Sequence, residues 1–85
     1  MGFTAEQLDE LNALLRFDLD TSQQGLKIHS NADAQVIAAT TRLHARGLIT
    51  QRDGGYLTPL GRDAAEQAQL LLSIFSTQPA HAQPA

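Results

Sequence analysis

The stretch that decides the fold is residues 43–61, which read LHARGLITQRDGGYLTPLG. Residues 48–51 and 56–58 are rich in apolar and β-branched side chains and predict two short strands. Residues 52–55 between them contain Asp-Gly and Gly-Gly pairs, which accept the positive φ angles of a tight hairpin turn. An isolated hairpin is marginal in water, so this one must pack against helices.

A helix is predicted before the hairpin, over residues 32–46. Ser30 or Asn31 supplies its start signal, and Gly47 is suited to end it in a left-handed conformation. At 100° per residue, one side of this helix is apolar and faces the core: Val36, Ala39, Thr40 and Leu43. The opposite side has few long side chains: Ala34, Gln35, Ala38, Thr41, Arg42 and Ala45.

A longer helix is predicted after the hairpin, over residues 59–75. Thr58 is its cap, and Pro59 occupies the first helical position, where a missing N–H costs no hydrogen bond. Apolar side chains cover more than half of the circumference in its last three turns. Residues 77–85 are small and proline-containing, and we expect them to form a disordered tail.

The N-terminal third contains one clear helix, over residues 5–17. Thr4 and Gln7 form a capping box at its start, and leucines recur at helical spacing. A short helical turn is predicted over residues 22–26, after which Leu26 and Ile28 enter the core.

Composition limits the function classes. A chain of 85 residues and 9.2 kDa allows a single domain, which we place at residues 1–76. The absence of cysteine excludes disulfides, cysteine-zinc sites and thiol catalysis. No apolar run approaches the length of a membrane span, and no secretory signal is visible. We expect a soluble cytoplasmic domain with no membrane partner.

The charges are distributed unevenly. The formal net charge is −3, which opposes binding to a polyanion. Residues 27–62, however, contain five of the six basic side chains and carry a net charge of +3. Such asymmetry favours an anionic partner for this part of the chain.

The order of these elements resembles a winged helix-turn-helix domain. Residues 43–49 (LHARGLI) and 55–61 (GYLTPLG) are similar to a pattern of bacterial regulators, in which a helix ends at glycine, a hairpin follows, and L-T-x-x-G opens the next helix. Among named groups of such regulators, the pattern resembles the multiple-antibiotic-resistance regulator group. Residues 3–75 also resemble a small bacterial family of uncharacterised proteins, which implies no activity. The expected fold class is mainly α, with three helices, a short hairpin wing and a long C-terminal helix.

This resemblance implies binding to double-stranded DNA and a role in transcription regulation, with helix 32–46 in the major groove. Gln35 and Arg42 would then lie near base edges, and Arg52 would reach the backbone from the hairpin tip. Phosphate contacts would come from further cations, including His29. The nominated DNA-binding residues are Lys27, Gln35, Thr41, Arg42, Arg46 and Arg52.

Two alternatives remain open at this point. The small side chains on helix 32–46 could instead receive a partner protein or pack against the final helix. The apolar excess of the final helix could close over helix 5–17 or form a homodimer, as the terminal helices do in the regulator group. The nominated dimer residues are Leu14, Leu70, Leu72 and Ile74.

Other titratable residues indicate no chemistry. His29 and His44 lack metal-ligand spacing, and Asp18 and Asp20 suit a turn. No serine, histidine and acid fall into a recognisable catalytic spacing. We therefore expect neither enzymatic activity nor a metal or cofactor.

Overall fold

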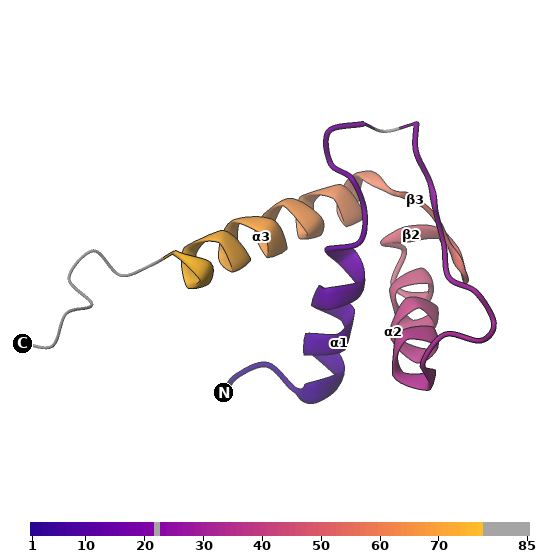
Figure 1. Ribbon diagram of the computed structural model, residues 1–85, viewed down its shortest axis with the longest axis horizontal. Helices are drawn as coiled ribbons and strands as arrows, with labels where there is room; N and C mark the ends of the chain where they lie inside the picture. The colour runs from indigo at the N-terminus through magenta and orange to yellow at the C-terminus, as the bar shows by residue number, and fades with distance from the viewer. Residues whose placement is uncertain (22, 78–85) are drawn as a thin grey trace, which may run out of the picture.

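The chain forms three helices and a small antiparallel sheet in the computed structural model, which describes residues 1–21 and 23–77 (Figure 1). The helices are α1 (Ala5–Leu14), α2 (Ala34–Ala45) and α3 (Pro59–Ser76). The strands are β1 (Leu26–Lys27), β2 (Ile49–Gln51) and β3 (Gly54–Leu57), in the sheet order β1-β3-β2. Helices α1 and α2 pack against each other, and α3 extends away from the sheet past α1.

The core lies where α1, α2, the start of α3 and the sheet meet. Leu43 of α2 and Ile49 of β2 are its largest fully buried apolar side chains. Burial of Ala39, Thr40 and Leu43 confirms the predicted inner side of the second helix. The other core members are small or come from α1 and the residues after it: Ala13, Leu14, Phe17 and Ala65.

One junction connects α2, the hairpin and α3. Gly47 has a φ of +77°, which confirms the left-handed end of the helix, and the Leu48 N–H reaches back to the Leu43 carbonyl at 3.0 Å. The Thr58 hydroxyl accepts a hydrogen bond from the Gly61 N–H at 3.0 Å and donates one to the Gly47 carbonyl at 2.6 Å. The Thr58 N–H also donates to the Leu48 carbonyl. A Cβ atom on Gly61 would overlap that same carbonyl, so only glycine fits there.

The hairpin contains the two predicted strands, but its two glycines lie in the second strand rather than in the turn, where they were expected. Gly54 and Gly55 belong to β3, with φ angles of +127° and +71°. The register shifts by one residue between the pairs Ile49↔Leu57 and Gln51↔Gly54, so the strand contains a bulge.

The short helix predicted over residues 22–26 is wrong for the described residues 23–26, which are not helical. Leu26 and Lys27 form strand β1, which pairs with Gly55 and Gly54 of β3. The strand approaches so closely that a Cβ on Gly54 would overlap the Leu26 carbonyl. This pairing depends on glycines almost 30 residues away, so local sequence could not indicate it. Burial of Ile28 is confirmed, whereas Leu26 is half-buried.

Helix boundaries differ from the predictions by a few residues. The capping box of Thr4 and Gln7 is present, but α1 ends at Leu14 rather than residue 17. The N–H groups of Arg16 and Phe17 bond three residues back, to the Ala13 and Leu14 carbonyls. Helix α2 begins two residues later than expected, because the Ala32 N–H closes a turn onto the His29 carbonyl. Apart from Thr77, the predicted tail lies outside the described residues.

The residues nominated for a dimer do not share one surface. Leu14 is 3% exposed and lies in the core, so its assignment to an interface is corrected. Its position on α1 four residues after Glu10 turns it towards α2. Leu70, Leu72 and Ile74 are exposed on α3. Within the described residues, neither α3 nor another helix has the length and apolar character needed to cross a membrane.

We predict that Gly61→Ala lowers the free energy of unfolding by about 3 kcal/mol, because the new methyl group displaces the Leu48 backbone. Gly47→Ala meets no atom and bears only the left-handed backbone penalty of about 1 kcal/mol. Urea denaturation of both variants measures the difference. Equal losses would contradict the junction described above.

Candidate functional site

The outward side of α2 is exposed and nearly free of long side chains. Ala34, Ala38 and Ala45 lie on it, together with Ile37, which is 37% exposed. Thr41 is half-buried, and its hydroxyl donates to the Ile37 carbonyl at 2.8 Å. Neither the sheet nor α3 covers this side, so it is open to a partner.

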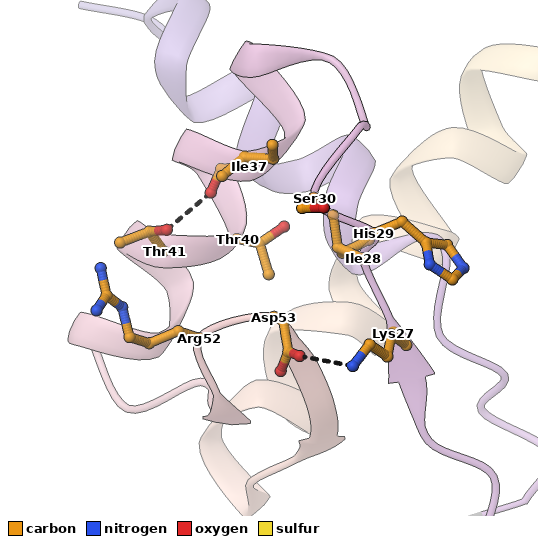
Figure 2. A pocket seen from close by; sticks show the side chains of 9 residues that line it. All are labelled: Lys27, Ile28, His29, Ser30, Ile37, Thr40, Thr41, Arg52 and Asp53. Atoms are coloured by element: carbon orange, nitrogen blue, oxygen red, sulfur yellow. Dashed lines mark hydrogen bonds and ion pairs between the residues drawn. The ribbon is translucent and has the colours of Figure 1, made fainter.

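A cleft of about 480 Å³ runs beside this side of α2 (Figure 2). One wall is α2, and the other consists of β1, the residues after it and the hairpin turn. Figure 2 shows the Arg52 side chain next to Thr41, and Lys27 across the cleft beside Asp53. The cleft is lined by Lys27, Ile28, His29, Ser30, Ile37, Thr40, Thr41, Arg52 and Asp53.

The charges at the cleft are two cations and one carboxylate. Lys27 Nζ lies 3.5 Å from Asp53 Oδ2, and both side chains are largely exposed, so water and salt screen this pair. Arg52 forms no ion pair with any described residue. The cleft therefore has one formal positive charge in excess, on a chain whose overall charge is negative.

Arg42, which was expected on the outward side of α2, lies with Arg46 on the edge of the helix that faces α1. Both reach across to α1 and bind Glu10, which is 4% exposed. Arg42 Nε lies 2.7 Å from Glu10 Oε2, and Arg46 Nη1 lies 2.9 Å from Glu10 Oε1. The hydrogen bond to Glu10 raises the pKa of Arg42 above its ordinary value, so its charge is permanent. The placement of Arg42 on the outward side is therefore corrected.

Gln35 is exposed near the start of α2 but also faces α1. It borders a hollow whose other walls include Asp9 and Arg16. The six nominated residues thus divide into two groups: Lys27, Thr41 and Arg52 meet at the cleft, while Gln35, Arg42 and Arg46 line the α1 edge of α2.

Sequence reasoning missed two carboxylates with structural roles here. Asp53 was assigned to the turn alone, because its approach to Lys27 depends on the unexpected strand β1. Glu10 did carry a signal, since it lies four residues before Leu14 and so shares the buried stripe of α1. A carboxylate on such a stripe requires a cationic partner.

The remaining titratable residues form no further site among those described. The Asp18 carboxylate accepts a hydrogen bond from the Asp20 N–H at 2.9 Å, which is the turn role expected of this pair. Within residues 1–21 and 23–77, no three His, Asp or Glu side chains gather in a way that could hold a metal ion.

We predict that Glu10→Gln lowers Tm by about 5–10 °C, because two arginines lose their shared carboxylate. Glu6→Gln removes the same charge one turn earlier, where the side chain is exposed, and leaves Tm nearly unchanged. Thermal denaturation followed by circular dichroism compares the two. A similar Tm for both variants would show that the Glu10 pairs contribute nothing.

Comparison with known proteins identifies a family but no characterised relative. Residues 1–76 match a family described as a family of unknown function, DUF5669. No curated protein and no solved structure matches the chain. The match covers all three helices and all three strands. The chain therefore belongs to the DUF5669 family.

Proposed function

We propose that this protein is a winged-helix domain that binds double-stranded DNA and acts in transcription regulation. Two features of the fold support this. Its elements follow the order helix, strand, helix, hairpin, helix, and the hairpin turn lies next to the exposed side of α2. In this proposal α2 enters the major groove, and the turn between β2 and β3 lies along the backbone.

The observation that carries the proposal is the exposed, small-residue side of α2 next to a cationic turn. The major groove is about 12 Å wide and admits a helix closely when its side chains are short. Ala34, Ala38 and Ala45 permit that approach, and Thr41 offers a hydroxyl to a base edge. Arg52 is then placed to bind a phosphate at the rim of the same groove.

The edge of α2 that faces α1 also contributes to DNA binding in this proposal, through Arg46. Its side chain is 56% exposed although one nitrogen binds Glu10, so it can also face a phosphate. Arg42, with 30% exposure, acts mainly to hold α2 on α1. Lys27, Arg46 and Arg52 give about three phosphate contacts per chain, which makes binding weak and strongly dependent on salt.

A protein partner on the same side of α2 is the second candidate. Ile37 is exposed between Ala34 and Ala38, which forms an apolar strip suited to a helix or strand of another protein. The net charge of −3 also favours this alternative. The two candidates differ in their response to salt.

Fluorescence anisotropy with a labelled duplex of about 20 base pairs tests the DNA proposal. With three phosphates neutralised, raising salt from 50 to 200 mM weakens binding about 40-fold. No binding at 50 mM salt, with the fold intact by circular dichroism, would overturn the proposal and favour a protein partner.

Two substitutions in the turn should change affinity in opposite directions. Arg52→Ala removes a phosphate contact and weakens binding several-fold, with a salt slope smaller by about 0.9. Asp53→Asn removes the carboxylate beside Lys27 and strengthens binding. Its backbone carbonyl, which accepts the Ile28 N–H, is unchanged.

Arg62→Gln is the matched control for charge. Arg62 lies on α3 against the Leu19 carbonyl and lines no part of the cleft, so losing its charge should leave the salt slope unchanged. Equal effects of the substitutions at Arg52 and Arg62 would indicate binding by net charge alone and would contradict the assigned interface.

A further inference from the structure

The C-terminal half of α3 exposes a large apolar surface. No charged residue follows Glu66 in the chain. Leu70 and Ile74 are each 58% exposed, Leu72 is 49% exposed and Phe75 is 79% exposed. Figure 1 shows that this half of the helix projects away from the sheet and α2. An isolated helix that is apolar on most sides is unfavourable in water.

An apolar groove of about 160 Å³ lies between this half of α3 and α1. Asn12 is its one polar lining residue, and no charged side chain lines it. Phe3 and Leu8, which form its outer rim, are 61% and 48% exposed. The other lining residues are Leu11, Leu15, Ala68, Leu71, Leu72 and Phe75.

The apolar residues of α3 point in two directions. Leu72 and Phe75 face the groove, whereas Leu70 and Ile74 lie about 150° away around the helix axis. Leu71 lies between these two faces. Helix α1 covers only the groove side, so the Leu70 and Ile74 face has no neighbour among the described elements.

The exposed apolar area approaches the area that each partner buries in a standard interface. The six exposed residues of the rim and of α3 leave roughly 700 Å² in contact with water, at about 200 Å² for a fully exposed side chain of this size. The largest apolar patch on a typical monomer is about 300–600 Å², and a standard interface buries about 800 Å² per partner.

The lack of cationic side chains around this apolar surface favours a second copy of the chain over a membrane as its partner. An anionic membrane surface would require lysine or arginine around the apolar face, but the nearby acidic residues Glu6, Asp9, Glu10, Asp63 and Glu66 outnumber the nearby basic residues Arg16 and Arg62. A protruding apolar ridge and an uncharged apolar groove occur on the same molecule. Such a surface is complementary to itself, as a two-fold symmetric dimer requires.

We infer that two copies of this chain form a dimer through α3, with each α3 lying in the other copy's groove. Leu70 and Ile74 of one copy pack against Phe3 and Leu8 of the second copy. Leu71 and Phe75 meet across the two-fold axis, so α1 and α3 of both copies form a four-helix arrangement. None of these residues lines the cleft beside α2, so this inference is independent of DNA binding.

Sedimentation or light scattering of the full chain tests the dimer. At about 100 μM, which exceeds the Kd of most standard interfaces, the mass should be twice 9.2 kDa. The double substitution Leu70→Glu and Ile74→Glu should return it to 9.2 kDa with helical content retained. Leu60→Glu is the matched control, since Leu60 is 59% exposed on the first turn of α3 and lines no part of the groove.

Disulfide crosslinking tests the geometry, because the chain has no cysteine of its own. Oxidation of a mixture of Phe3→Cys and Ile74→Cys chains should give mostly mixed dimers. A mixture of Thr50→Cys and Ile74→Cys chains, in which Thr50 is an exposed site on β2, should give no mixed dimers. A monomer at all concentrations, a dimer that survives the double substitution, or sedimentation with anionic vesicles as a monomer would each overturn the inference.

Discussion

The position of α3 relative to α2 and the hairpin depends on the backbone carbonyl of Leu48. The Thr58 N–H bonds to it, and the Cα of Gly61 lies against it. The Thr58 hydroxyl at the same time caps α3 and binds the Gly47 carbonyl at the end of α2. The junction thus sets the direction in which α3 leaves the sheet. It buries Gly61 and Ala65 on one side of the first turns of α3 and lets the C-terminal half of the helix project beyond the core.

A second constraint holds one side of α2 against α1. Glu10 is almost fully buried and has two arginine partners, so α2 is held against α1 along the edge that carries Arg42 and Arg46. The outward side of α2 is free for this reason. The cleft beside it and the apolar groove of α3 share no residue. One small domain therefore presents two separate surfaces, one polar with cations and one uncharged.

Features governed by neighbours in sequence were predictable. The capping box of Thr4, the left-handed Gly47, the cap at Thr58 and the hairpin are all present, because each depends on residues within a few positions. The prediction of the inner side of α2 was also correct, since helical periodicity determines which residues share a face. Strand β1 was missed because its partner lies on β3.

The candidate site was predictable only in part, for the same physical reason. The sequence by itself determined the caps, the turn, the period of each helix and the concentration of cations in residues 27–62. The tertiary structure alone decided which of those cations bind a carboxylate of the same chain. Arg42 and Arg46 are paired with Glu10 more than 30 residues away, and Leu14 is inside the core rather than on a surface. Side-chain partners across elements depend on the crossing of helices and on strand pairing, and these arise from packing rather than from local preference.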